Sequence, residues 1–341
     1  MSATVCVTSR NEHYLWYVLD ALKGGADPSQ YEVIIYDDNS SEPIEINKLI
    51  YPNVRVIHSG VNRGVAFGFD RLVEQAKYET IILMGGDVIV KNTDWLSIAE
   101  DYVNKYPYGI GCSVCLSGNP EHLNPFNPAN DVKRYGATLL PYFTSDELPS
   151  DSPLLSLQYV VDMFGARWIK KVPEKDIQEV PMAYGAMYIT NKSWFNYIHG
   201  WDTVGNIKLS GLSMWGGIED HLCLKAYLYG GVCHVIKNLE SLHIFNKFDD
   251  NDVHNGRLDH YWYSKMFIGK TLLSDDDCQR LVEKVYKQRV SYELPTLPFN
   301  LGKKMIRQNK EYVSLVRERN RKAFVHDFDW YLTRFNIEKG F

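Results

Sequence analysis

Residues 32–40, EVIIYDDNS, decide the fold class of this chain. An uninterrupted apolar run ends in a polar cluster that begins at Asp37, and such a run is typical of a strand buried on both faces of a sheet. The same pattern precedes it in residues 4–12, TVCVTSRNE, and follows it in residues 80–87, TIILMGGD. The repetition predicts neighbouring parallel strands whose carboxyl ends carry polar side chains.

Helical patterns separate these strands. A helix is expected after the first strand, because an apolar stripe follows Ser9 and Glu12, which have the spacing of a capping box. The stripe consists of Leu15, Val18, Leu19 and Leu22. A third strand is predicted over residues 54–58 and a second helix over residues 64–78. The alternation predicts an α/β fold with helices on both faces of the sheet, and ligands bind such sheets beyond the carboxyl ends of the strands.

The rest of the chain has a different organisation. Residues 117–160 are rich in Pro, Asn, Ser and Asp, which is typical of a loop-rich insertion that carries recognition loops. An ordered strand is expected over residues 180–190. From residue 256 the pattern is helical to the end. We therefore expect a domain over residues 1–255 and a helical C-terminal extension over residues 256–341.

The composition excludes several classes of protein. The 341 residues are 45% hydrophobic and 23% charged, which is ordinary for a globular protein and excludes disorder. The sequence has no apolar run of about 18 residues and no N-terminal signal-peptide pattern. The six cysteines are scattered, and Cys112 and Cys115 are predicted to belong to a buried strand. We expect reduced thiols, no transmembrane segment and a cytoplasmic location.

Seven segments resemble the GT-A glycosyltransferases, above all the family 2 enzymes and the polypeptide N-acetylgalactosaminyltransferases. In chain order they are VCVTSRNE (5–12), VIIYDDNS (33–40), NRGVAFGFDRLVEQA (62–76), ILMGGDV (82–88), PMAYGAMYI (181–189), WGGIEDHLCLKAYLYGG (215–231) and LHIFNK (242–247). Each segment alone is weak evidence for the resemblance, but all seven occur in the order and at the spacing of the family. The resemblance implies a GT-A, Rossmann-like mixed sheet flanked by helices, which binds a nucleotide-sugar.

The resemblance assigns the nucleotide to the first two segments. Asp38, with Asp37 beside it, is expected to accept a hydrogen bond from a uracil ring, because an ionised carboxylate is a pure acceptor. The alternative is an Asx turn or a helix cap at the same residues. Thr8 and Arg10 match positions that line the nucleotide, and Arg10 is expected to pair with phosphate.

Further nucleotide-sugar contacts are expected from later segments. Asn62 and Arg63 open a predicted helix, whose free N–H groups attract phosphate. Gly185 lies in the segment that resembles the strand along the donor sugar. Trp215 lies in the segment that resembles a loop over the donor, where it is expected to stack on the sugar. Lys247 is expected to contact the leaving phosphate.

A divalent cation is implied by two of the segments. Asp87 matches the last Asp of the family's Asp-x-Asp motif, which binds a cation that neutralises the leaving diphosphate. Gly85 replaces the first Asp, and together with Gly86 it permits close backbone approach to a ligand. His243 matches the C-terminal metal ligand of the family. An imidazole with carboxylate and phosphate oxygens suits Mn²⁺, or Mg²⁺, better than Ca²⁺.

Glu219 and Asp220 are the candidates for the base that activates the acceptor. A direct match of the acidic pair favours Asp220. If residues 222–225, Leu-Cys-Leu-Lys, are aligned with the family's Leu-x-Leu-Arg motif, Glu219 is favoured instead. Acidic residues also favour a helix N-terminus for electrostatic reasons alone. The base-like pair favours inversion of the anomeric centre, whereas the likeness to N-acetylgalactosaminyltransferases favours retention.

Residues 301–323 form a basic segment with eight Lys or Arg and two Glu. Its charge of +6 contrasts with the net charge of −5 of the chain. The segment is either the solvated face of a packed helix or a contact for a polyanion, such as nucleic acid or an anionic membrane surface.

The sequence therefore predicts a metal-dependent glycosyltransferase with a nucleotide-sugar donor, expected to be UDP-linked. The acceptor hydroxyl belongs to a glycan, a protein or a nucleic acid, and the sequence leaves these open. One alternative is a glycosyltransferase of viral type that acts on modified DNA bases. Another, motivated by Gly85, is a non-catalytic nucleotide-sugar-binding module.

Overall fold

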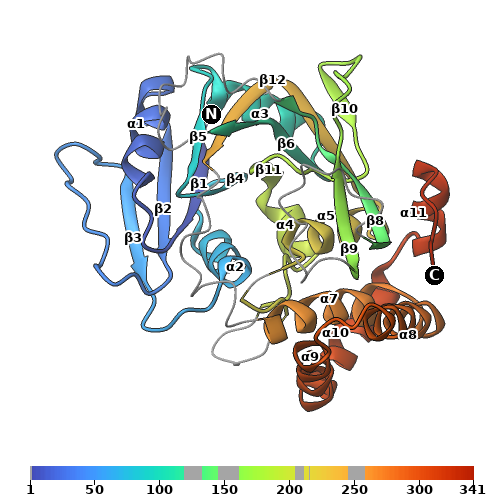
Figure 1. Cartoon of the computed structure of the whole chain (residues 1–341). Helices are drawn as coiled ribbons and strands as arrows, with labels where there is room; N and C mark the ends of the chain where they lie inside the picture. Colours follow the sequence, from blue (N-terminus) through green and yellow to red (C-terminus); the bar gives the residue numbers. More distant parts are fainter. Residues whose placement is uncertain (1, 119–132, 145–160, 204–210, 215, 245–257) are drawn as a thin grey trace. The chain divides into compact units, whose positions relative to one another are not determined.

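The computed structural model describes residues 2–118, 133–144, 161–203, 211–214, 216–244 and 258–341 (Figure 1). Contacts divide the chain into two compact units. The first unit comprises Met1–Ala137, Trp168–Gly200 and Gly231–Asp249, and the second comprises Thr138–Arg167, Trp201–Gly230 and Asp250–Phe341. The second unit thus joins the predicted C-terminal extension to two earlier segments. A domain boundary at residue 255 stays a prediction.

The first unit contains a mixed sheet in the order β10-β12-β6-β11-β4-β1-β2-β3. The predicted parallel strands are confirmed: they are β1 (Ala3–Ser9), β2 (Tyr31–Asp37), β3 (Val54–His58) and β4 (Thr80–Gly85). The other strands of the order are β6 (Gly109–Gly118), β10 (Ile177–Glu179), β11 (Met187–Asn191) and β12 (Val232–Ile244). Two short strands complete the sheet: β5 (Val88–Val90) pairs with β12, and β7 (Lys133–Arg134) pairs with β6. Because β11 runs antiparallel to β4 and β6, the sheet is mixed.

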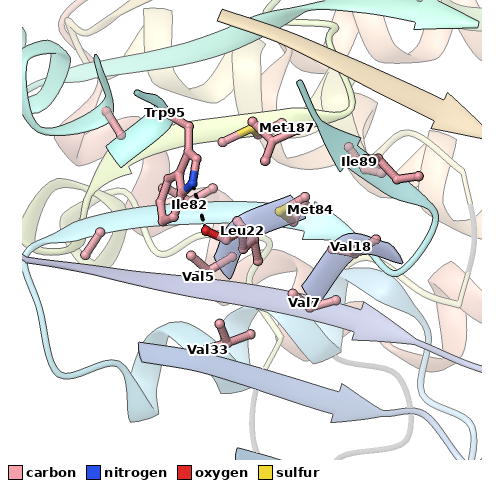
Figure 2. Close-up of a cluster of buried hydrophobic side chains, with 14 of the residues drawn as sticks. Val5, Val7, Val18, Leu22, Val33, Ile82, Met84, Ile89, Trp95 and Met187 are labelled. Carbon is pink, nitrogen blue, oxygen red and sulfur yellow. Dashed lines mark hydrogen bonds between the residues drawn. The ribbon is translucent and has the colours of Figure 1, made fainter. Parts of the chain in front are cut away.

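Helices cover both faces of β1 and its neighbours. The helices of this unit are α1 (Leu15–Gly25), α2 (Val65–Gln75), α3 (Trp95–Lys105) and α4 (Lys192–Tyr197). Figure 2 shows Val5, Val33 and Ile82 packed in one cluster with α1 and α3, where Trp95 Nε1 donates to the Leu22 carbonyl at 3.2 Å. On the opposite face α2 lies so close that a Cβ on Gly68 would come within 2.8 Å of Thr8 and Tyr36. Continuous apolar strands are therefore required.

The capping box predicted at Ser9 and Glu12 is wrong. Ser9 is the last residue of β1, and α1 begins only at Leu15, after an N-cap residue, Tyr14, whose side chain makes no cap bond. Glu12 Oε1 accepts a hydrogen bond from the Tyr14 N–H at 3.2 Å instead. The polar residues after β1 thus form a connection between strand and helix, and the helix is stabilised by burial of its apolar stripe.

Three later predictions differ from the structure. The strand expected over residues 180–190 begins only at Met187. The apolar runs at residues 232–236 and 242–245 predict two strands, but within the described residues they belong to one strand, β12, with an irregularity between Ile236 and Glu240. Within the predicted insertion, Ala137–Thr144 forms β8, which pairs with β9 (Val161–Trp168). Buried and half-buried residues alternate along β8, as expected when one face packs against the core.

The helical C-terminal region is confirmed. The second unit contains α5 (Ile218–Leu228), α7 (Leu258–Leu272), α8 (Asp275–Ser291), α9 (Leu297–Gln308), α10 (Lys310–Ala323) and α11 (Phe328–Phe335). No helix in the described part of the chain combines the length and the apolarity needed to cross a bilayer. All six cysteines are buried and none forms a disulfide, and Cys112 and Cys115 lie in β6 as predicted.

Helix α5 is buried nearly all round although it carries charged side chains. Lys225 Nζ lies 2.7 Å from Asp202 Oδ2, and Arg319 binds the other oxygen of the same carboxylate. Burial alone would raise the pKa of Asp202, but Lys225, His221 and Arg319 hold it below its ordinary value. Pairing on this scale is required because an unpaired buried charge is very costly.

We predict that the protein loses stability between about pH 6.5 and about pH 4 because two buried histidines stay neutral when it is folded. Burial lowers the pKa of His221 and of His234 from 6.5 to about 4. In that window the unfolded chain binds protons that the folded chain does not. The free energy of unfolding therefore decreases as the pH is lowered, by up to about 3 kcal/mol per histidine. Urea unfolding at several pH values measures it.

The matched variants are His221→Gln and His234→Gln, each of which removes one titrating group, and His13→Gln, which removes an exposed one. The first two should show a smaller loss of stability on acidification than the unchanged protein. An equal loss in all variants would contradict the assignment to the buried imidazoles.

Candidate functional site

The carboxyl ends of β1, β2 and β4 are joined by backbone hydrogen bonds. The Asp38 N–H donates to the Ser9 carbonyl at 2.9 Å, and the Gly86 N–H donates to the Thr8 carbonyl at 2.9 Å. Asn11 ties the two following loops together, because its Oδ1 accepts from the Ser41 N–H at 2.8 Å. The predicted polar clusters at these three strand ends are therefore adjacent, as expected for parallel strands.

Asp37 is buried and holds the loop after β2. Its carboxylate accepts from the N–H of Ser40 at 3.0 Å and of Ile44 at 3.3 Å, and it lies 3.0 Å from His58 Nδ1. Burial alone would raise the pKa of Asp37, but these hydrogen bonds lower it below its ordinary value. Asp37 is thus an ionised residue that shapes the loop.

Asp38 holds the turn that leads into α2. Its Oδ1 accepts from the Arg63 N–H at 2.6 Å and its Oδ2 from the Gly64 N–H at 2.8 Å. Both N–H groups precede the helix, whose first residue is Val65, so they are not the first-turn N–H groups to which phosphate binding is predicted. A carboxylate offers about four acceptor positions, and uracil recognition by Asp38 stays a prediction beside its role in this turn.

Arg63 brings a cation to this end of the sheet. Its guanidinium lies over the Phe67 ring at 5.4 Å, and that of Arg71 lies over the same ring at 5.6 Å. Asn62 is half-buried before the helix, and Arg10 is exposed after β1. The predicted cations therefore belong to the same group of strand ends as Asp38.

Asp87 and His243 meet, although they are far apart in the sequence. The distance between His243 Nε2 and Asp87 Oδ2 is 3.2 Å, and about a quarter of each side chain is exposed. The pairing of β12 with β5 places His243 opposite Val88, the residue after Asp87. Two ligands at right angles on an octahedral ion with bonds of about 2.1 Å lie about 3 Å apart. The contact is itself a hydrogen bond, and its length also equals the spacing of two ligands of one cation.

The two glycines before Asp87 make room for it. A Cβ on Gly85 would lie 2.4 Å from Asp87 Oδ1, so the carboxylate occupies the space that a side chain at position 85 needs. A Cβ on Gly86 would lie 3.1 Å from both Ser9 Oγ and Glu12 Cγ. The absence of side chains at both positions lets the end of β4 approach the end of β1.

Two polar residues of this region were missed by the sequence analysis. Ser9 Oγ is buried and has no hydrogen-bond partner among the described residues, although it lies beside Gly86. A buried orphan hydroxyl is rare and indicates a missing partner. Arg134 donates to Ser117 Oγ, and Ser117 is the neighbour of His243 across the β6–β12 pairing. Arg134 lies within residues 117–160, which were predicted as a loop-rich insertion, so its strand pairing gave no sequence signal.

Gly185 lies against β6 with no room for a side chain. A Cβ on Gly185 would lie 2.2 Å from the Ser113 carbonyl oxygen. Its own carbonyl accepts from Ser113 Oγ at 2.6 Å and from Ser241 Oγ at 3.2 Å. Close packing thus accounts for this glycine, and contact of its segment with a sugar stays a prediction.

Glu219 and Asp220 belong to the second unit and differ in exposure. Asp220 is 3% exposed, and its Oδ2 lies 2.8 Å from Lys265 Nζ. Burial alone would lower the pKa of Lys265, but the carboxylates of Asp220 and Asp162 raise it above its ordinary value. Glu219 is half-buried. Asp220 therefore joins α5 to α7 by a buried ion pair, and Glu219 is the accessible acid of the two.

Two predicted contacts, Trp215 and Lys247, lie outside the described residues. Within the described part of the chain there is no group of three or more His, Cys, Asp or Glu side chains arranged to hold a metal. A cation at Asp87 and His243 therefore needs its remaining ligands from the substrate, from water or from residues beyond that part.

The mixed sheet and its polar strand ends define the class of protein as the GT-A glycosyltransferase fold. The family model "Glycosyl transferase family 2" matches residues 4–146. A crystal structure of GalNAc-T7 with UDP, GalNAc and Mn²⁺ superposes with a TM-score of 0.65 at 13% identity, over 98% of this chain and 56% of that one. The resemblance to the GT-A glycosyltransferases is confirmed, and residues 4–146 are similar to the family 2 enzymes.

Two sequence relatives agree with this assignment. Human polypeptide N-acetylgalactosaminyltransferase 10 is 20% identical over 229 residues, which are 64% of this chain and 33% of that protein. The rat protein of the same name is 20% identical over 222 residues, with the same coverage. The chain thus spans about a third of the length of these curated relatives.

We predict that Asp38→Ala destabilises the first unit by about 1–2 kcal/mol, because it leaves the Arg63 and Gly64 N–H groups without their acceptor. Urea unfolding measures this change. The matched control is Asp94→Ala, since Asp94 precedes α3 as its N-cap residue but its side chain makes no cap hydrogen bond. Equal destabilisation by both substitutions would show that the two hydrogen bonds of Asp38 do not stabilise the fold.

Proposed function

We propose that this chain is a metal-assisted glycosyltransferase that takes a sugar from a UDP-linked donor. The observation that carries the proposal is the 3.2 Å contact between Asp87 and His243, which stands beside the joined ends of β1, β2 and β4. The family 2-like region and the GT-A fold support a transferase. The UDP, GalNAc and Mn²⁺ named for the GalNAc-T7 structure support the nature of the donor and the cation.

Asp87 and His243 are the proposed protein ligands of the cation. One carboxylate and one imidazole, completed by diphosphate oxygens and water, suit Mn²⁺, or Mg²⁺, as the ion. When bound, the cation neutralises the charge of the leaving diphosphate. The space left by Gly85 supports this assignment, because it allows the Asp87 carboxylate to lie where the family's first Asp would stand.

The remaining residues of the strand ends are proposed to hold the nucleotide. Asp38 accepts from the base, and the buried Ser9 hydroxyl donates its unused hydrogen bond to the donor molecule. The side chains of Arg63 and Arg134 supply positive charge for the phosphates, since charge-assisted hydrogen bonds to phosphate are the strong ones.

Glu219 is the proposed base, which takes the proton from the acceptor hydroxyl. Asp220 has its Oδ2 on Lys265 and is buried, so we assign it the role of positioning α5. Glu219 is half-exposed on the same turn and is suited to proton transfer at an acceptor hydroxyl.

A second candidate function is nucleotide-sugar binding without transfer. Two features favour it: Asp220 is buried in an ion pair, and Gly85 replaces the first Asp of the Asp-x-Asp motif. In both cases a carboxylate that the family uses for catalysis or cation binding is lost or occupied. Tight binding of UDP with no hydrolysis or transfer across a broad panel of donors and acceptors distinguishes it from the enzyme.

We predict that Asp87→Asn and His243→Asn each weaken Mn²⁺ binding at least about 100-fold, since even indirect partners of metal ligands change affinity 10–100-fold. Paramagnetic resonance of free Mn²⁺, titrated in the presence of UDP, measures the affinity. UDP-sugar hydrolysis or transfer should be lost in the same variants.

The matched control is Asp94→Asn, an exposed carboxylate in the same region of the chain. Its Mn²⁺ affinity and its turnover should equal those of the unchanged protein. Unaltered Mn²⁺ binding in Asp87→Asn would refute the proposed cation site.

We predict that Gly85→Ala keeps the fold but lowers Mn²⁺ affinity at least about tenfold. The added Cβ meets only the flexible end of Asp87, so the free energy of unfolding should change by less than about 1 kcal/mol, while the carboxylate must rotate away. Gly60→Ala is the control, because no atom lies within 4 Å of a Cβ there. An increase in Mn²⁺ affinity in Gly85→Ala would contradict this account.

A further inference from the structure

Helix α9 packs with one side only on the second unit. Phe299 is fully buried, and its ring centroid lies 5.0 Å from that of Trp262 on α7. A Cβ on Gly302 would lie 2.7 Å from the Cβ of Trp262, so the two helices approach closely along the line of Phe299 and Gly302. This side of α9 is accounted for by the core of the unit.

The opposite side of α9 carries exposed leucines next to a lysine. Because an α-helix turns about 100° per residue, Leu297, Leu301 and Lys304 lie about 140–200° around the axis from Phe299. Leu297 is 69% exposed and Leu301 is 38% exposed, and Lys304 is exposed as well. The helix thus has a second, outward apolar strip.

The charge around this strip is of one sign. Residues 297–310 contain four basic residues, Lys303, Lys304, Arg307 and Lys310, and no acidic residue. The basic residues of α10 differ, since Arg317 and Arg321 pair with Asp275 and Lys322 pairs with Glu318. The basic segment predicted from the sequence is therefore partly neutralised in α10, whereas α9 keeps its positive field.

Helix α8 contacts α9 on the side away from this strip. The Tyr286 ring lies 5.7 Å from that of Phe299, and Lys303 Nζ lies 5.8 Å from the Tyr286 ring. The exposed face of α8 near this contact carries Glu283 as well as Lys287, so its charge is mixed. The outward strip of α9 is therefore the basic apolar surface of this region.

We propose that the outward face of α9, formed by Leu297, Leu301, Lys304 and Arg307 and flanked by Lys303 and Lys310, docks on an anionic lipid bilayer. Cations around exposed leucines match the headgroup layer, where phosphates attract the cations and the apolar side chains enter the acyl boundary. A nucleic acid would use the cations but would give Leu297 and Leu301 no apolar partner. The proposal is independent of the proposed transfer reaction.

The test is vesicle flotation of the full chain with phosphatidylcholine vesicles that contain about 30 mol% phosphatidylserine, and with pure phosphatidylcholine vesicles. We expect binding to the anionic vesicles only, weakened by salt. Lys304→Ala with Arg307→Ala should lower the partition at least about tenfold, since each cation near the surface contributes about fivefold. Leu297→Ser with Leu301→Ser should also lower it clearly.

The matched control is Leu49→Ser with Lys171→Ala, which removes an exposed leucine and an exposed lysine of the first unit. This variant should bind as the unchanged protein does. Equal binding by all variants, or no binding to anionic vesicles, overturns the proposal. Salt-sensitive binding to a DNA duplex that is lost in the charge variant but kept in the leucine variant, without vesicle binding, also overturns it and points to a polyanion contact.

Discussion

Burial of β1, β2 and β4 on both faces is the constraint on which the site depends. With α1 and α3 on one face and α2 on the other, these strands have no interior position for an unpaired polar side chain. Polar residues are therefore concentrated where the strands end. The ends are adjacent because the strands are parallel and in register. A cluster with binding chemistry follows from the packing of a sheet whose interior is apolar.

Several polar residues at these ends have a structural role, and for Asp38 we propose a binding role as well. Asp37 orders a loop, and Asp38 holds the turn before α2 with both oxygens. A carboxylate fixed in this way is already desolvated and oriented, so a ligand that binds it does not have to order it. Structural and binding roles thus reinforce each other here. The Ser9 hydroxyl is the exception, because no group within the described residues forms a hydrogen bond with it.

The second unit handles buried charge by pairing. Lys225 and Arg319 bind Asp202, and Lys265 binds Asp220, in an interior that would otherwise exclude these groups. Such pairs are specific in geometry even where their net contribution to stability is small. They join α5 to α7 and α10, and they leave Glu219 as the accessible acid of its pair. Outside this interior the cations of α9 have no such partners among the described residues, and the surface there is basic.

The sequence by itself determined the alternation of strands and helices, the polar strand ends and the C-terminal helices, because local periodicity and burial patterns are written in neighbouring residues. It also brought Asp87 and His243 together as a hypothesis, through resemblance. Tertiary structure alone decided that the two meet at 3.2 Å, that Asp38 holds the turn before α2, that Asp220 is paired and that Arg134 stands beside the strand of His243. The physical reason is that these contacts join residues far apart in the chain, so their distances depend on strand order and register, which no local pattern contains.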